Sequence, residues 1–322
     1  MNVTVLDDYQ DVVRTFPSFA RMARHEVTIY NDHVQDTESL AERLKNTDAL
    51  LLIRERTAIG RELLQLLPRL RFISQSGAIP HIDLQACAEH GVTVCSRVAA
   101  VRPSYATAEL AWALVLAAWR RIPQEAAHLR SGGWQSTHAV GTTLRGRTLG
   151  IYGYGRIGAV VAGYGRAFGM RVMAYGRQGS LARAAADGMV LATSERQLFA
   201  DSDVLSLHMA LTDTTRGMVR REHLALMKPT GLIVNTSRAR LIEEGALIEA
   251  LRLGNPGLAA VDVFEEEPLI GASDPLLSLP NVLATPHLGY VERESLEFMF
   301  DMIFEQVEAF ERGTPVNVVE PH

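Results

Sequence analysis

Several short apolar runs in the second half of the chain are each followed by a polar residue that could take part in catalysis. These residues are His208, Arg238, Asp262 with Glu267, and His287. Taken singly, each could be a helix cap, part of a turn or a polar residue of the core. If the runs are parallel strands, however, their carboxyl ends meet at the edge where open α/β sheets bind ligands. Together the residues therefore predict a reaction site.

A histidine, a glutamate and an arginine suit hydride transfer between a nicotinamide and a carbonyl group. The carbonyl oxygen becomes an alkoxide, and a histidine can protonate it near neutral pH. A carboxylate on the other ring nitrogen fixes the imidazole and favours its protonated form. An arginine binds a substrate carboxylate and polarises the carbonyl. His287, Glu267 and Arg238 match these three roles in residue type.

A glycine-rich turn in the segment GIYGYGRIG indicates a nucleotide site. Gly153, Gly155 and Gly158 have the G-x-G-x-x-G spacing, which is a weak signal by itself. Here an apolar run precedes the turn and a helical pattern follows it at residues 156–168. Glycines in this context permit a tight turn and a close approach of a pyrophosphate to the helix N-terminus. The alternative is a tight turn that binds no ligand.

The residue that selects the cofactor is expected at the end of the next strand. An acid there would bind the ribose 2′-hydroxyl of NAD and repel the 2′-phosphate of NADP. Gly176 stands 18 residues after Gly158, in the segment MAYGRQ, and Arg177 follows it. An arginine matches the geometry of a phosphate, so we expect NADP(H) to be favoured over NAD(H). The alternative is that Arg177 is a surface residue and that either cofactor binds.

Two series of alternating strands and helices must position these residues, which predicts two α/β units with parallel sheets. The first series has expected strands at Val3–Leu6, Val27–Tyr30, Ala49–Ile53, Phe72–Ser74 and Val92–Cys95. The second has expected strands at Leu149–Tyr152, Arg171–Tyr175, Val204–Leu207, Leu232–Asn235, Leu258–Val263 and Val282–Ala284.

Three helices frame the second series. A long helix is expected from about Tyr105 to Arg121, capped by Ser104 or entered at Pro103. A second helix reaches Arg130, and the last runs from about Arg293 to Arg312.

Composition bounds the class of protein. The 322 residues are 47% hydrophobic and 21% charged, which is ordinary for a globular chain. The net charge of -5 gives no electrostatic reason to expect a nucleic acid or an anionic membrane as partner. Cys87 and Cys95 form no C-x-x-C pair and no cluster with metal-ligand spacing. We therefore expect no metal and two buried thiols, with a disulfide between them as the alternative.

The N-terminus, MNVTVLDDYQ, lacks the features of a signal peptide. The longest apolar run, Leu110–Trp119, is too short to span a bilayer. A cytoplasmic location is expected.

Five motifs, in order and spacing, resemble the D-isomer-specific 2-hydroxyacid dehydrogenase family, which includes D-3-phosphoglycerate dehydrogenases and glyoxylate/hydroxypyruvate reductases. They are GYGRIG, LHMALTDTTRGM, MKPTGLIVNTSRARLIEEGALIEAL, DVFEEEPL and NVLATPHLGY. The resemblance implies an NAD(P)-dependent enzyme that acts on a small 2-keto or D-2-hydroxy acid, mainly as a reductase.

The resemblance also implies an architecture. A Rossmann dinucleotide-binding domain, residues 100–290, is inserted into a flavodoxin-like substrate domain, residues 1–99 and 291–322. Members of the family are usually homodimers, with the long helix near Tyr105–Arg121 at the interface.

Site residues follow from the matched motifs. Arg238, Glu267 and His287 match the catalytic arginine, glutamate and histidine, and Asp262 matches an aspartate near the nicotinamide carboxamide. The residues expected to bind the cofactor are Gly153, Gly155, Arg156, Ile157, Gly158, Gly176, Arg177, His208, Thr215, Thr236, Asp262 and Gly289. The residues expected to bind the substrate are Arg54, Gly77, Ala78, Arg238 and His287, with the backbone N–H groups of the loop SQSGAIPH holding the carboxylate.

Four positions depart from the family pattern. Ala210 stands where proline is common, Ala239 where glycine usually follows the arginine, and Ala78 where a second glycine is usual. Tyr290 replaces a small residue after PHLG. Ala78 and Tyr290 lie near the expected substrate pocket, so the identity of the substrate does not follow from the resemblance.

Two other functions share this fold. Formate dehydrogenases carry a glutamine where Glu267 stands here, and formate oxidation needs no proton donor, so the Glu–His pair argues against that activity. Transcriptional corepressors of the same family bind NAD(H) without turnover and can keep the catalytic trio. Turnover of a small 2-keto acid would separate an enzyme from such a binding protein.

Overall fold

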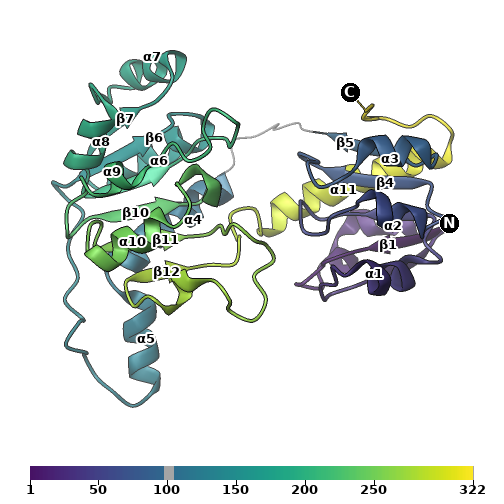
Figure 1. Ribbon diagram of the computed structural model, residues 1–322, viewed down its shortest axis with the longest axis horizontal. Helices are drawn as coiled ribbons and strands as arrows, with labels where there is room; N and C mark the ends of the chain where they lie inside the picture. The colour runs from purple at the N-terminus through teal and green to yellow at the C-terminus, as the bar shows by residue number, and fades with distance from the viewer. Residues whose placement is uncertain (98–104, 322) are drawn as a thin grey trace. The chain divides into compact units, whose positions relative to one another are not determined.

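The computed structural model describes residues 1–97 and 105–321 (Figure 1). The chain divides into two compact units, Met1–Val101 with Arg293–His322 and Arg102–Glu292. The expected helix cap at Pro103 or Ser104 and the expected domain boundary at residues 99 and 100 lie outside the described residues.

The first unit is built on a five-stranded parallel sheet with the order β2-β1-β3-β4-β5. Its strands are β1 (Asn2–Val5), β2 (Glu26–Ile29), β3 (Ala49–Leu51), β4 (Phe72–Ser76) and β5 (Thr93–Arg97). This is the flavodoxin-like order, in which the direction of winding reverses between β1 and β3. Ligands of such sheets bind beyond the carboxyl ends of the strands at that reversal.

Helices cover both faces of this sheet. They are η1 (Val13–Thr15), η2 (Pro17–Met22), α1 (Thr37–Leu44), α2 (Arg61–Gln65), α3 (Leu84–Glu89) and α11 (Arg293–Glu311). Helices α1 and α2 bury leucines, and α3 buries Ala86 and Cys87, in one core cluster. Helix α11 packs against β4 and η2, where Phe310 stacks on Phe72 with ring centroids 4.4 Å apart. The C-terminal helix therefore belongs to the core of the first unit.

The second unit is a doubly wound parallel sheet of seven strands with the order β12-β11-β10-β9-β6-β7-β8. Its strands are β6 (Thr148–Tyr152), β7 (Arg171–Tyr175), β8 (Val190–Leu191), β9 (Val204–Leu207), β10 (Leu232–Asn235), β11 (Leu258–Val261) and β12 (Val282–Ala284). The order matches the Rossmann arrangement with one further strand at the edge.

The helices of the second unit lie on both faces of its sheet. They are α4 (Tyr105–Trp119), α5 (Ile122–Arg130), α6 (Arg156–Ala167), α7 (Gln178–Ala186), α8 (Glu195–Asp201), α9 (Arg221–Leu224), α10 (Ala246–Leu253), η3 (Ala239–Leu241) and η4 (Pro275–Ser278). Because side chains alternate along a strand, every strand of this sheet except β8 supplies both cores. In β10, for instance, Leu232 and Val234 face one core and Ile233 faces the other.

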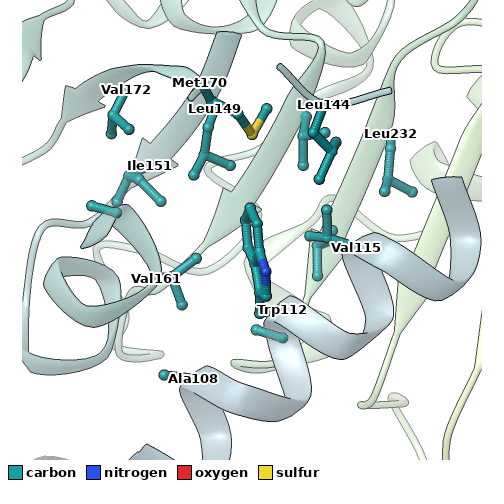
Figure 2. Packing of buried hydrophobic residues seen from close by; sticks show 14 of the residues in the cluster. Ala108, Trp112, Val115, Leu144, Leu149, Ile151, Val161, Met170, Val172 and Leu232 are labelled. Carbon is teal, nitrogen blue, oxygen red and sulfur yellow. The ribbon is translucent and has the colours of Figure 1, made fainter. Parts of the chain in front are cut away.

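Helix α4 is the centre of the first of these cores. Figure 2 shows Trp112 and Val115 of α4 pointing into a cluster that includes Leu149 and Ile151 of β6. Seven residues of α4 are buried, so the apolar run that is too short for a membrane span forms a core helix. No helix in the described part of the chain has the length and apolar character that a membrane crossing requires.

The structure contains every strand that the sequence predicts, with ends that differ by up to two residues. The two-residue strand β8 was not predicted; its residues, Val190 and Leu191, are exposed at the edge of the sheet. Cys87 and Cys95 are buried free thiols, so the alternative of a disulfide between them is wrong.

Candidate active site

The three expected catalytic residues lie on loops that follow adjacent strands of the second unit. Arg238 follows β10, Glu267 follows β11 and His287 follows β12, and these strands are neighbours in the parallel sheet. Their carboxyl ends therefore lie along one edge, where side chains from different loops can act on one substrate.

His287 and Glu267 form a direct pair. Nδ1 of His287 lies 2.5 Å from Oε2 of Glu267, and Oε1 of Glu267 accepts a hydrogen bond of 2.8 Å from the backbone N–H of Phe264. The carboxylate is thus fixed at one oxygen by the backbone and binds the imidazole with the other. This leaves Nε2 as the ring nitrogen that can exchange a proton with a substrate.

The loop that carries His287 has an unusual backbone conformation. His287 has φ of 52°, in the left-handed region that non-glycine residues rarely adopt. Strain of this kind persists where surrounding contacts hold it, and such contacts gather at functional sites. The ring of Tyr290 packs on the imidazole in a T-shaped contact, with centroids 5.4 Å apart and planes at 76°.

Asp262 is the anchor of this loop. Its carboxylate is fully buried and accepts three hydrogen bonds, from the Thr285 hydroxyl at 2.6 Å and from the backbone N–H groups of Leu288 at 2.8 Å and Gly289 at 2.9 Å. Burial raises the pKa of Asp262, while the three donors act in the opposite direction. Asp262 was expected beside the nicotinamide carboxamide. In this structure its visible task is to hold the segment on both sides of His287.

A second anchor of the loop comes from α4. The hydroxyl of Thr107 donates a hydrogen bond of 2.7 Å to the carbonyl oxygen of Gly289. A Cβ added to Gly289 would lie 3.3 Å from both Asp262 Oδ2 and Thr107 Cγ2, so this glycine allows a close approach. Thr107 could not be identified from the sequence, because 182 residues separate it from its partner.

The turn after β10 presents Arg238. The buried side chain of Asn235 accepts a hydrogen bond from the N–H of Ser237 and donates one to the carbonyl oxygen of Arg238, both at 3.0 Å. The Ser237 hydroxyl donates to the carbonyl oxygen of Leu207 on the neighbouring strand. The guanidinium of Arg238 donates to the Ser237 carbonyl oxygen at 2.8 Å. The side chain of Asn235 therefore stabilises the turn that carries Arg238, a role that was not predicted from the sequence.

The glycine-rich turn fits a dinucleotide. Gly153 has φ of 97°, and a Cβ there would lie 2.7 Å from the carbonyl oxygen of His208. A Cβ on Gly158 would collide with the carbonyl oxygen of Gly153. Gly155 is the N-cap of α6, and no side chain lies within 4 Å of where its Cβ would be. The N-terminus of α6, which begins at Arg156 and Ile157, is therefore open to a phosphate group.

Gly176 and Arg177 lie between β7 and α7. Arg177 is the N-cap residue of α7 and is exposed, and its side chain has no hydrogen bond or ion pair with any described residue. The hydroxyl of Ser180, in the first turn of α7, accepts a hydrogen bond of 3.0 Å from the N–H of Tyr154. Ser180 thus links this turn to the glycine-rich turn, a contact that the motif spacing does not reveal.

His208, Thr215 and Thr236, which are also expected to bind the cofactor, differ in their burial and hydrogen bonds. Burial lowers the pKa of His208 to about 4, and its Nε2 lies 2.9 Å from the Ser206 hydroxyl, so the ring is neutral at pH 7. The Thr215 hydroxyl donates to the carbonyl oxygen of Ala210 at 2.7 Å and closes its own loop. The buried Thr236 hydroxyl has no hydrogen-bond partner among the described residues, which is the state expected of a group that awaits a ligand.

Arg54, Gly77 and Ala78 belong to the first unit and follow β3 and β4. Arg54 has φ of 58°, and a Cβ on Gly77 would lie 2.5 Å from its Nη1. The N–H of Gly77, expected to bind a substrate carboxylate, donates instead to the carbonyl oxygen of Arg97. The carbonyl oxygen of Ala78 accepts from the Gln75 side chain at 2.7 Å. Within the described residues no group of three or more His, Cys, Asp or Glu side chains is placed to hold a metal.

Comparison with known proteins identifies relatives across nearly the whole chain. Residues 112–289 match the family described as D-isomer specific 2-hydroxyacid dehydrogenase, NAD binding domain. Over 292 residues the chain is 39% identical to a glyoxylate reductase of Aeropyrum pernix, covering 88% of this chain and 85% of that one.

Two further relatives are named for a phosphorylated acid. The chain is 38% identical over 277 residues to a D-3-phosphoglycerate dehydrogenase of Methanocaldococcus jannaschii; the match covers 86% of this chain and spans about half, 52%, of that protein. The crystal structure of a phosphoglycerate oxidoreductase from Vibrio cholerae superposes with a TM-score of 0.92 at 47% identity, covering 97% of this chain and 99% of that one.

Proposed function

The chain belongs to the D-isomer-specific 2-hydroxyacid dehydrogenase family, oxidoreductases that act on a CH–OH donor with a nicotinamide cofactor, and we propose that this member reduces small 2-keto acids of the glyoxylate and hydroxypyruvate type. The observation that supports this most directly is the contact of 2.5 Å between His287 Nδ1 and Glu267 Oε2. A carboxylate in that position favours the protonated imidazole, which is the form that reduction of a carbonyl consumes.

In this reaction the nicotinamide supplies the hydride that reaches the carbonyl carbon. Arg238 binds the carboxylate of the keto acid and polarises its carbonyl group. His287 donates the proton on Nε2 to the carbonyl oxygen as it gains negative charge, and Glu267 stabilises the imidazolium and holds the ring plane. The product is the 2-hydroxy acid, and a proton from solvent restores His287.

The cofactor is held by residues of the second unit. We propose that the N–H groups at the start of α6 bind the pyrophosphate and that Thr236 contacts the cofactor through its free hydroxyl. We also propose a preference for NADP(H). Its support is the absence of an acid at Gly176 together with the exposed guanidinium of Arg177, which has no ion pair with any described residue.

A second copy of this chain is the proposed partner. Figure 1 shows α5 and the segment after it extending away from the sheet of the second unit. No residue of α5 is buried, and four large apolar side chains of this arm, Ile122, Leu129, Trp134 and Val140, are 53% to 90% exposed. Exposed apolar surface of this extent is typical of subunit interfaces. Sedimentation equilibrium of the full chain tests the dimer.

The activity is tested by following oxidation of NADPH and NADH with glyoxylate, hydroxypyruvate and larger 2-keto acids. We expect turnover of the small acids with NADPH preferred. Arg177→Gln is expected to raise the KM for NADPH about tenfold and leave that for NADH within twofold, because only the 2′-phosphate loses a partner. Equal use of both cofactors by the unaltered enzyme would refute the proposed role of Arg177 and would leave the proposed reaction unaffected. Tight cofactor binding without turnover of any keto acid would refute the proposed reaction.

A further inference from the structure

The second unit contains a cavity of about 410 Å³ at the carboxyl edge of its sheet. Asn235 and Val261, at the ends of β10 and β11, line it together with α10 and the loop after β11. Leu247, Phe264 and Leu269 are among its apolar walls. All of the lining residues belong to the second unit. A cavity of this size can hold a bulky side chain or a small ligand.

The rim of this cavity is acidic. Its carboxylates are those of Glu243, Glu244, Glu265, Glu266 and Asp274, and none of the described residues that line the cavity is a lysine or an arginine. Glu243 is paired with Arg221 at 3.2 Å, whereas the other four carboxylates form no ion pair with any described residue. Unmatched carboxylates beside apolar walls suit a partner that is both cationic and apolar.

The arm that contains α5, residues 120–141, has this complementary character. Arg120 and Arg130 are exposed and form no ion pair with any described residue. The one acid of the arm, Glu125, is bound by the backbone N–H of Ser136 at 3.1 Å. The arm also has large exposed apolar side chains, of which Trp134, at 77%, is the bulkiest. It therefore carries both the positive charge and the apolar surface that the cavity lacks.

The arm and the cavity of one chain lie at opposite ends of the sheet. Helix α4 begins at the carboxyl edge, where Thr107 binds Gly289, and its 15 residues span about 22 Å. The arm follows α4, and the N–H of Thr142 donates to the carbonyl oxygen of Trp119, so its two ends meet. The chain then enters β6 at Thr148, the amino end of that strand. The arm extends away from the sheet (Figure 1) and does not reach the cavity of its own chain.

We propose that the arm of a second copy docks in this cavity, with Trp134 against the apolar walls and the two guanidinium groups beside the acidic rim. The inference rests on the proposed homodimer and names the surface that holds it together. A two-fold axis perpendicular to the strands sets the two sheets antiparallel, which brings the amino edge of each copy to the carboxyl edge of the other. The contact is then made twice, as in other isologous dimers.

The test measures the dimer dissociation constant of the full chain by sedimentation equilibrium. Trp134→Ser is expected to weaken association about 30-fold, because a buried tryptophan is often the anchor of an interface. A reversed arm, Arg120→Glu with Arg130→Glu, and a reversed rim, Glu244→Lys with Glu265→Lys, should each weaken it at least tenfold. The chain with both reversals should regain at least tenfold over the weaker of the two, because opposite charges face each other again.

Two exposed residues provide matched controls. They are Leu191 in the edge strand β8 and Arg196 in α8, and neither lines the cavity. Leu191→Ser and Arg196→Glu make the same kinds of change as the arm variants, and we expect the dissociation constant to stay within twofold of that of the unaltered chain.

The outcomes separate this inference from the dimer on which it rests. If the unaltered chain is a monomer at every concentration tested, the proposed dimer fails and the inference with it, whereas keto-acid turnover is measured independently. If the chain dimerises and the arm and rim variants stay within threefold, the dimer stands and the docking site is wrong. If both reversals weaken the dimer and their combination regains nothing, the arm and the rim are not in contact and the inference is also overturned. A variant that had lost its fold would not regain association through a second reversal.

Discussion

Replacement of Glu267 by glutamine removes one negative charge beside His287 and leaves the shape of the side chain. The ring nitrogen and the carboxylate oxygen are 2.5 Å apart, which places the charge centres about 4 Å apart, and at an effective dielectric constant of about 20 their attraction is about 4 kcal/mol. The two side chains are 26% and 29% exposed, so solvent screening reduces this to about 2 kcal/mol. If the imidazolium is the proton donor, kcat/KM for keto-acid reduction falls about 30-fold near neutral pH.

The assay is steady-state reduction of glyoxylate near neutral pH. Glu266→Gln is the matched control, since Glu266 is an exposed acid in the same loop, and it should stay within twofold of the unaltered enzyme. A loss below threefold in Glu267→Gln, or an equal loss in the control, would refute the electrostatic role.

Two other perturbations test the surroundings of the site. Tyr290→Ala should lower kcat/KM for glyoxylate about fivefold, because a T-shaped ring contact stabilises by about 1 kcal/mol. Tyr290→Phe keeps the ring and should stay within twofold of the unaltered enzyme. Similar losses in both variants would show that the hydroxyl matters instead of the ring. Burial lowers the pKa of His208 to about 4 in the folded protein, below the value of about 6.5 in the unfolded chain. The neutral ring therefore contributes stability that is complete above pH 6.5 and is lost as the pH falls towards 4. The total loss is about 3 kcal/mol. Urea unfolding at pH 7 and pH 4.5 should therefore show a smaller loss of stability in His208→Gln than in the unaltered protein, and an equal loss would contradict this assignment.

Local patterns in the sequence were sufficient to predict the sheets and the direct contact between His287 and Glu267. The strands are short, mainly apolar runs between helical patterns, because both units bury the two faces of the central strands of a parallel sheet. Glu267 and His287 follow adjacent parallel strands, which explains why residues 20 apart in sequence meet. The glycine-rich turn was predictable because its spacing coincides with the end of a strand and the start of a helix.

Contacts between distant segments were not predictable in the same way. Thr107 and Gly289 meet only because α4 packs against the strands at this end of the sheet. The N–H of Gly77 was expected to face a substrate, yet the parallel pairing of β4 with β5 directs it to the carbonyl oxygen of Arg97. Strand β8 has only two residues, which is too few for an alternation of side chains to show in the sequence. In each case the contact is made with a residue of another helix or strand, which a local sequence pattern does not show.

The role of Asp262 follows from the same reasoning. A buried carboxylate is costly unless donors surround it, and here the three donors all come from the segment Thr285–Gly289. That segment has to turn sharply enough to place His287 at φ of 52°, a conformation that costs about 1 kcal/mol or more for a residue with a side chain. The three hydrogen bonds offset that cost, because opening the loop would leave a buried charge without partners. The burial of Asp262 and the strain at His287 are therefore two parts of one arrangement, which holds the imidazole in place before any substrate arrives.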